Sequence, residues 1–203
     1  MYIKSHHHNK ERNEAFAFLN TQPFGLLIAN LGIRSWGVHL PFILNADHTL
    51  SSHMAKANPL AQQWITEKVT DEVLVVFQGA SGYISGSWYS QEEVSTYNYT
   101  ALHVYAKVEL LNQQETLSDL TVLMNTHEAQ QKKPKFMSDY APETLRQVNG
   151  VLGFKLSISE MHFAQKLSQE RTEDRKRVIE QLETRTPSEQ ALAKDMKQLK
   201  HTP

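Results

Sequence analysis

The chain has 203 residues, of which 40% are apolar and 21% are charged, with a formal net charge of −1 and no cysteine. This length and composition are typical of one globular domain with a small appendage. The near-zero charge argues against a protein whose main task is to grip nucleic-acid phosphates, and the lack of cysteine excludes disulfides, a thiolate nucleophile, iron–sulfur clusters and cysteine zinc sites.

Hydrophobic periodicity and turn residues predict a mixture of many short strands and a few helices. The first half of the chain predicts a helix at 11–19, a hairpin of strands at 25–29 and 36–44 with its turn at 30–32, a turn at 47–48 before a short strand at 51–53, and a helix at 59–67. A buried strand at 73–77 follows Asp71 and Glu72, and a longer strand is predicted at 98–110. Next come a helix with Leu117, Leu120, Met124 and His127 on one face, a loop marked by Pro134 and Pro142, and two strands at 150–158 and 161–168.

The strand at 98–110 has the clearest pattern in the chain. One parity runs from Thr100 through Leu102 and Val104 to Leu110, while the other contains His103 and charged residues. One face is therefore expected to pack and the other to be partly wet. In the second of the two later strands, the same alternation predicts that Lys166 and Ser168 share a face and can address one ligand.

The C-terminal segment predicts two helices. Thr186, Pro187, Ser188 and Glu189 form a capping box with proline at the first helical position, and Leu192, Met196 and Leu199 make a narrow apolar stripe that must dock on something. From Glu170 onward the sequence has eight basic and seven acidic residues, so the net charge of this segment is close to zero. We expect two domains, a barrel at 1–170 and a helical extension at 171–203.

Short strands with alternating faces favour an α+β protein that is mainly antiparallel β, a barrel with helices at its ends, over a doubly wound sheet. The glycines at 79 and 82 have the wrong spacing for a dinucleotide-binding loop. No apolar run is long enough to cross a bilayer, and no signal core follows the N-terminal positive residues. We therefore expect a soluble, cytoplasmic protein.

Six clusters combine flat apolar side chains with hydroxyls, amides and single cations. They lie at 38–42, 52–59, 76–79, 83–89, 96–99 and 166–171. This mixture is what a planar heteroaromatic ring and a phosphate tail require, because charge-assisted hydrogen bonds hold the phosphate and apolar faces cover the ring. A flavin mononucleotide (FMN) site is the leading inference.

Six motifs spread in order over nearly the whole chain resemble the PaiB-type, FMN-binding negative transcriptional regulators. They are Met1-Tyr2-Ile3, His39-Leu40-Pro41-Phe42, His53-Met54-Ala55-Lys56-Ala57-Asn58-Pro59, Tyr83-Ile84-Ser85-Gly86-Ser87-Trp88-Tyr89, Tyr97-Asn98-Tyr99 and Lys166-Leu167-Ser168-Gln169. The resemblance implies a split β-barrel related to pyridoxamine-phosphate oxidases and flavin reductases, usually a homodimer with flavin sites in the subunit interface. This chain departs from the family pattern at Gly86, Ser52 and Glu170, where the family more often has proline, glycine and asparagine.

Side-chain chemistry suggests a role for each candidate cofactor residue. The expected cations are Lys56, Lys166 and Arg171, and the hydroxyl donors are Ser85, Ser87 and Ser168. The amides Asn58, Asn98 and Gln169 can match the pyrimidine edge of the flavin, the aromatic residues Tyr83, Trp88, Tyr97 and Tyr99 can cover its ring, and His53 lies beside Lys56 and Asn58 as a further candidate.

Several of these residue types also have structural interpretations. Trp88 is equally well explained as a core or interface aromatic residue, and His39 and His103 are expected to be hydrogen-bonded core histidines. The histidines at 6–8 could chelate a metal loosely but are expected to form a mobile, incidental cluster. We expect no catalytic residue, because no serine has a nucleophile-elbow sequence around it.

Two classes of function remain open from the sequence. One is an FMN-binding regulator that acts as a homodimer and lowers gene expression, although no helix-turn-helix or basic groove helix supports direct contact with DNA. The other is an FMN-dependent oxidoreductase of the flavin reductase or oxidase type, in which Lys166 would stabilise reduced flavin.

Overall fold

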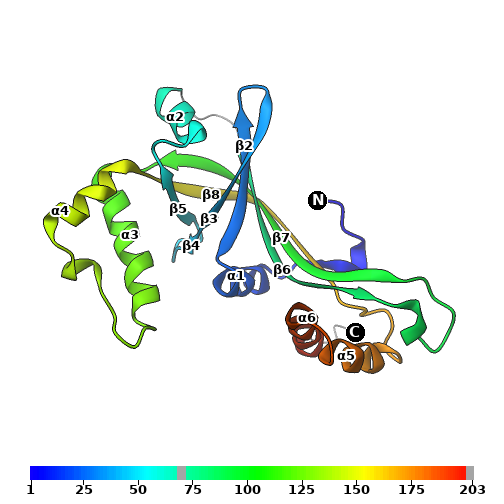
Figure 1. The fold of residues 1–203 in the computed structure, drawn as a ribbon. Coiled ribbons are helices and arrows are strands. Elements are labelled where there is room, and N and C mark those ends of the chain that lie inside the picture. The colour runs from blue at the N-terminus through cyan, green and yellow to red at the C-terminus, as the bar shows by residue number, and fades with distance from the viewer. Residues whose placement is uncertain (68–71, 200–203) are drawn as a thin grey trace. The chain divides into compact units, whose positions relative to one another are not determined.

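The computed structural model describes residues 1–67 and 72–199 (Figure 1). Asp71, predicted to precede a buried strand, and the last residues of the predicted C-terminal extension lie outside the described residues. The strands are β1 (His8–Asn9), β2 (Phe24–Leu31), β3 (Arg34–Pro41), β4 (Ile43–Leu44), β5 (Leu50–Ala55), β6 (Glu72–Ile84), β7 (Thr96–Leu110) and β8 (Val151–Lys166). The α-helices are α1 (Arg12–Thr21), α2 (Pro59–Thr66), α3 (Gln113–Glu128), α4 (Pro142–Leu145), α5 (Arg175–Glu183) and α6 (Pro187–Gln198), and the short 3₁₀ helices are η1 (Ser5–His7), η2 (Gly86–Trp88), η3 (Met137–Asp139) and η4 (Arg146–Gly150).

The chain forms two compact units, which are described separately. Unit 1 contains Met1–Phe18, Phe77–His103 and the described residues from His162 on, and unit 2 contains Leu19–Val76 and Val104–Met161. The boundary passes through α1, β6, β7 and β8, so each of these elements contributes to both units. Among the described residues, no helix has the length and apolar character needed to cross a bilayer.

The strands pair in the order β3-β2-β6-β7-β8-β5-β4, and β1 pairs with β8 outside this path. Every pairing with a defined register, including β2 with β3 and β5 with β8, is antiparallel. The predicted hairpin is confirmed, with its turn at Gly32 and Ile33 rather than at 30–32. Gly32 adopts a φ of 59°, a conformation that glycine reaches without steric cost.

The predicted alternation in β7 is confirmed. Thr100, Leu102, Val104 and Ala106 are buried, whereas the side chains of the other parity are mostly half-buried or exposed. β6 extends well beyond the predicted strand at 73–77, because the small residues at 79–82 continue in extended conformation and do not form a loop. A sidechain at Gly79 would meet the ring of Phe18 at 2.9 Å, so the strand has space only for glycine there.

The prediction of two strands at 150–158 and 161–168 is wrong at the break. Residues 151–166 form the single strand β8, and the polar residues that suggested a turn are exposed within it. The Ser159 hydroxyl donates a hydrogen bond to the Tyr105 carbonyl of β7 at 3.0 Å. This side-chain contact connects the polar stretch of β8 to the neighbouring strand. The strand ends at Lys166, so the alternation does not reach Ser168, whose φ is 54°.

The predicted apolar face of the helix after β7 is wrong in part. Leu120 is buried, but Leu117 is 37% exposed and His127 lies in solvent. Thr116 takes the buried place on the first turn, where a Cβ added to Gly153 would meet its Oγ1 at 2.5 Å. The helix therefore packs closely against the glycine of β8 through a small hydroxyl residue, which a hydrophobic count does not detect.

Both C-terminal helices are confirmed, as is the capping box that starts α6. The Thr186 side chain accepts a hydrogen bond from the Glu189 amide, and the Glu189 carboxylate accepts one from the Thr186 amide. α5 and α6 lie side by side (Figure 1). Their apolar side chains form one buried cluster with residues from the end of β6 and the segment after β8, namely Ile84, Leu167, Val178, Leu182, Leu192, Ala193 and Met196. The apolar stripe of α6 thus docks within unit 1.

Candidate functional site

The predicted cofactor residues fall into two groups. His53, Lys56 and Asn58 belong to unit 2, and the other eleven belong to unit 1.

The unit 2 group lies at the end of β5 and the start of α2. Asn58 is the N-cap of α2, and its Oδ1 accepts a hydrogen bond from the Leu60 amide at 3.0 Å. Lys56 donates to the Asn149 carbonyl at 2.9 Å. His53 is half-buried, and burial lowers its pKa below 6.5, so its imidazole is neutral at neutral pH. The Asn58 oxygen and the Lys56 ammonium thus already have local partners.

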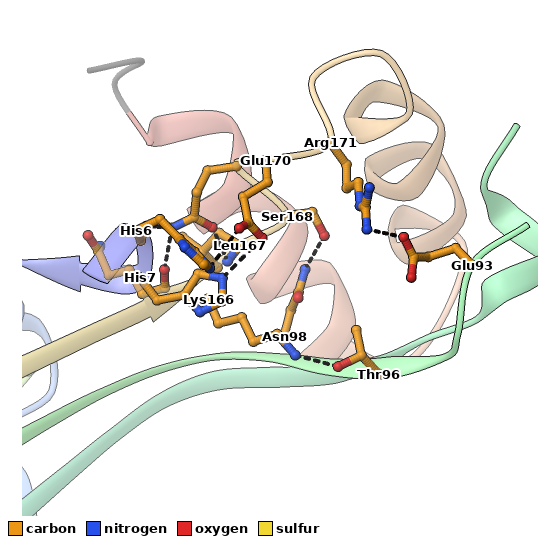
Figure 2. A network of polar contacts seen from close by, with 12 residues as sticks. His6, His7, Glu93, Thr96, Asn98, Lys166, Leu167, Ser168, Glu170 and Arg171 are labelled. Carbon is orange, nitrogen blue, oxygen red and sulfur yellow. Dashed lines mark hydrogen bonds and ion pairs between the residues drawn. The ribbon is translucent and has the colours of Figure 1, made fainter. Parts of the chain in front are cut away.

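The unit 1 group is centred on a buried contact between β7 and the segment after β8 (Figure 2). Asn98 Nδ2 donates to Ser168 Oγ at 2.8 Å, and both residues are buried. The positive φ of Ser168 turns the chain so that its hydroxyl meets Asn98. The Asn98 Oδ1 and the Thr100 Oγ1 are buried with no hydrogen-bond partner among the described residues, which is uncommon for polar atoms in a folded protein.

Lys166 ends β8 beside this contact. Its Nζ hydrogen-bonds Thr96 Oγ1, and the structure describes no ion pair for it. Burial lowers the Lys166 pKa, and the nearby charge of Lys4 acts in the same direction. The Gln169 side-chain amide has local partners, because it accepts from the Leu167 amide at 2.8 Å and donates to the Gln165 carbonyl at 2.6 Å.

Arg171 follows this segment and forms an ion pair with Glu93, as Figure 2 shows. The Arg171 side chain is 50% exposed. Its amide donates to the Ser168 carbonyl at 3.1 Å. The guanidinium that was predicted to face a phosphate therefore meets a carboxylate of the same unit.

The aromatic candidates divide between an exposed face and a packed position. Tyr83 on β6 and Tyr97 on β7 make an edge-to-face pair with ring centroids 5.8 Å apart, and they are 43% and 61% exposed. Strand alternation places Tyr97 and Tyr99 on the face of β7 opposite Asn98. Trp88 instead packs against the buried cluster of the C-terminal helices, with the Arg185 guanidinium 5.4 Å from its ring centroid. These contacts support the interpretation of Trp88 as a core aromatic residue.

Ser85 and Ser87 flank a tight turn at the end of β6. Their hydroxyls lie 2.8 Å apart, and Ser85 caps η2 by accepting from the Ser87 amide. The Gly86 amide donates to Ser95 Oγ at 3.0 Å, and an added Cβ at Gly86 would meet the Glu93 carbonyl oxygen at 2.2 Å. Proline, the residue more frequent in the family, would lack this donor and clash there.

The other two departures from the family pattern also have local partners. Ser52 Oγ donates to the Pro41 carbonyl at 2.7 Å within unit 2. In unit 1 the Glu170 carboxylate lies 2.7 Å from His6 Nε2 and 3.7 Å from His7 Nε2. His7 is buried, and its pKa is lowered mainly by that burial. The sequence showed the three histidines and the unusual glutamate, but not that the fold brings them together.

The N-terminal histidines, expected to form a mobile cluster, lie in regular elements. Residues 5–7 form η1, and His8 pairs with Ala164 on β8. The expectation for His39 is wrong, because its side chain is exposed and stacks on Phe24 with centroids 6.0 Å apart. His103 is half-buried, and burial lowers its pKa, but its Nδ1 has no partner among the described residues.

The antiparallel sheet and the family match of residues 1–160 together place this chain among the flavin-binding split-barrel proteins. Residues 1–160 match the family model described as "Putative FMN-binding domain", and the chain belongs to this family. It is 35% identical over 204 residues to the protease synthase and sporulation protein PAI 2 of Bacillus subtilis (strain 168), covering 98% of this chain and 96% of that protein. FMN is the cofactor that this family membership assigns, and the predicted PaiB-type resemblance is confirmed.

Two solved structures show the same fold at low sequence identity. The flavocytochrome Anf3 of Azotobacter vinelandii has a TM-score of 0.64 and 14% identity, over 81% of this chain and 72% of that chain. The FAD and heme binding protein of Mycobacterium smegmatis has a TM-score of 0.60 and 14% identity, over 79% of this chain and 73% of that chain. The predicted fold class is therefore confirmed.

The residues of unit 1 fit FMN by the chemistry of their donors. Unit 1 has a half-buried lysine, two serine hydroxyls at a turn and an exposed pair of tyrosine rings, and a cation, hydroxyl donors and flat apolar surface are the groups that a flavin phosphate and ring require. Asn98 Oδ1 leaves a buried acceptor unused. Lys166 and Asn98 face one side of β7, however, and the tyrosine pair faces the other.

Proposed function

We propose that the protein is an FMN-binding, homodimeric negative regulator of gene expression, of the PaiB type. The observation that carries this proposal is the 35% identity with PAI 2 over nearly the full length of both chains. The family supplies the cofactor. That relative is named a protease synthase and sporulation protein, and a negative effect on gene expression is the role we propose for this chain.

The homodimer is supported by the exposed aromatic surface of unit 1. Tyr83 and Tyr97 are large, exposed and in edge-to-face contact on regular strands, and exposed aromatic side chains of this kind are enriched at protein interfaces. The tyrosine pair and Lys166 lie on opposite faces of β7, so one flavin cannot contact both within a single subunit. In a homodimer, one subunit would supply the tyrosine rings and the other the lysine. Each flavin site would then be built from both subunits.

Regulation is expected to act through a partner rather than through a basic DNA-reading helix. In the basic triplet at the start of α5, Arg175 is buried and hydrogen-bonds the Met196 carbonyl, and Arg177 pairs with Asp174 at 3.6 Å. Lys176 and Arg177 are exposed, at 88% and 53%, but Lys176 also has an acidic partner, Glu180, at 3.9 Å. Such a helix start offers little charge for phosphate contacts.

The first experiment measures FMN affinity in a lysine variant. Lys166→Met removes the half-buried cation at nearly constant volume, and we expect FMN to bind about 10- to 100-fold more weakly, as the loss of one charge-assisted hydrogen bond predicts. Lys176→Met, which removes an exposed lysine in the same unit, is the matched control and should bind FMN like the wild type. Equal affinities in the two variants would remove Lys166 from the site.

The regulatory role is tested with a reporter strain. Deleting the gene should raise expression from its targets, and restoring the wild-type chain should lower it again. A deletion that changes no transcript while the purified protein still binds FMN would reject the regulatory role and leave the cofactor assignment intact.

A second function is favoured by Lys166 itself. A partly desolvated cation beside a flavin would stabilise the negative charge of its reduced form, as flavoenzymes require. The protein would then be an FMN-dependent oxidoreductase of a small molecule. Rapid bleaching of bound FMN by NADH or NADPH would favour this alternative, and inert FMN would count against it.

A further inference from the structure

We propose that His6, His7 and Glu170 form a binding site for one divalent transition-metal ion, with zinc as the best match. The three side chains each present one ligand atom, and these atoms lie within 4.8 Å of one another. Two imidazole nitrogens and a carboxylate oxygen are a ligand set that zinc accepts while keeping a fourth position open. The site belongs to unit 1 and uses none of the predicted flavin ligands.

The distances require only a small adjustment to admit a metal. His6 Nε2 is 2.7 Å from one oxygen of Glu170, and His7 Nε2 is 3.7 Å from the other. Zinc at about 2.0–2.2 Å from each ligand would separate neighbouring ligand atoms by roughly 3.3 Å in tetrahedral geometry. With the Glu170 oxygen beside His6 as the ligand, that oxygen must move away from His6 Nε2 by about half an ångström. Glu170 is 49% exposed on a turn, where its side chain has room to do so.

The backbone around the ligands is held by contacts between segments that are far apart in sequence (Figure 2). The His6 carbonyl accepts a hydrogen bond at 3.0 Å from Nε2 of Gln169, the residue that precedes Glu170 in the chain; Figure 2 shows His6 and His7 beside Glu170. The His7 amide donates to the Lys4 carbonyl at 2.9 Å, which closes η1. Since His8 then enters β1 and pairs with Ala164, the two histidines are positioned by the fold rather than by chance encounters of a loose tail.

An adjoining cavity of about 490 Å³ provides access to the site. All three ligands line it, together with His8, Gln165 and the acidic residue Glu14. The cavity leaves space for water or a small ligand at the open coordination position. Glu11 and Glu14 add negative charge to the wall, which also contains Lys10. Their charge opposes the repulsion that a cation would feel from Lys10 and from Lys4 and Lys166, the two lysines that act on His7.

Calorimetric titration of the chelator-treated full chain with ZnCl₂ tests the proposal. We expect saturation at one zinc per chain. Glu170→Gln should weaken binding by at least about ten-fold, because loss of even an indirect supporting contact typically costs 10- to 100-fold in metal affinity. Glu173→Gln makes the same charge change at an exposed position outside the site and should leave the affinity unchanged. His8→Ala should also leave it unchanged.

The histidine variant separates a built site from a loose three-histidine chelate. If His8→Ala abolished binding and Glu170→Gln did not alter it, the metal would be held by a flexible histidine run and the proposal would be overturned. Absence of saturable binding would overturn it as well. Glu170→Asn, which carries the residue more frequent in the family, provides a second variant if Glu170→Gln does not fold, and circular dichroism of each metal-free variant verifies the fold.

Discussion

Gly86 lies where the chain after β6 returns close to its own backbone. A Cβ at this position would come within 2.2 Å of the Glu93 carbonyl oxygen, and that oxygen belongs to the backbone and cannot rotate away. The Gly86 amide also donates to Ser95. The presence of glycine at position 86, where the family more often has proline, therefore allows the 89–95 loop to pass this close. The same loop carries Glu93, the ion-pair partner of Arg171.

Replacing Gly86 with alanine tests this coupling. Gly86→Ala should lower the free energy of unfolding by about 1–3 kcal/mol, the usual cost of forcing extra volume into a closed site. Gly150→Ala is the matched control, because an added Cβ there meets nothing within 4 Å, and its effect should stay within about 0.5 kcal/mol. Urea unfolding of the two variants measures the difference, and equal effects would show that the loop moves freely.

His53 makes stability depend on pH. Burial holds the pKa of His53 below its ordinary value of 6.5, so between the folded pKa and 6.5 the unfolded chain binds more protons than the folded chain. The stabilisation is complete above pH 6.5 and is lost as the pH falls through the folded pKa. His53→Gln should therefore show a smaller loss of unfolding free energy between pH 7 and pH 5 than the wild type.

The control for this pH dependence is His127→Gln, at an exposed position on α3. It should retain the wild-type slope of unfolding free energy against pH. A wild-type slope in His53→Gln would contradict the role of His53. His7 and His103, whose pKa values are also lowered by burial, contribute to the slope that remains.

At the scale of single elements, α5 and α6 stabilise unit 1 through their shared buried cluster. Leu192 and Met196 on α6 are completely buried against residues of α5, β6 and the segment after β8. The cluster also places Met196 beside Asn98, with 3.9 Å between sulfur and Nδ2. The C-terminal helices thus cover the polar contact at the centre of the candidate site.

Truncating Leu192 tests the contribution of this packing. Leu192→Ala should cost about 2–5 kcal/mol of unfolding free energy, because it leaves a cavity that the surrounding helices cannot fill. Leu117→Ala makes the same truncation on α3, where the side chain is 37% exposed, and should cost much less. A small effect at Leu192, measured by chemical denaturation, would mean that α6 is not an integral part of the unit.

Local signals in the sequence predicted the elements well where one face is buried or a cap is formed. The alternation of β7 and the capping box of α6 are both present as predicted. The false break in β8 arose because exposed polar residues within a strand resemble a turn. The burial of Thr116 depends on the absence of a side chain at Gly153, a contact between two elements that no local pattern contains.

The contacts of the candidate site residues were harder to predict than the helices and strands, because each polar side chain can bind several partners in the protein as well as a cofactor. The link between Asn98 and Ser168 depends on a positive φ that serine rarely adopts. Arg171, predicted as a phosphate ligand, pairs with Glu93, and Asn58 caps a helix. The pairings of Asn98 and Arg171 join segments that the sequence alone cannot align, whereas the Asn58 cap is local to the start of its own helix.

At the scale of the whole molecule, family membership and fold agree on a flavin-binding split barrel. The division of candidate residues between the two faces of β7 explains why we expect two subunits per site. Light scattering of the purified protein should give the mass of two chains. A tyrosine-pair variant, Tyr83→Ser with Tyr97→Ser, should shift the mass toward one chain and weaken FMN binding in parallel.

Titration of the purified, flavin-free protein with FMN, followed by quenching of flavin fluorescence, tests the central claim most directly. The account predicts saturable binding at one FMN per chain, with the absorption bands of the flavin perturbed by the protein. A folded protein that leaves FMN fluorescence and absorption unchanged at every concentration would contradict it.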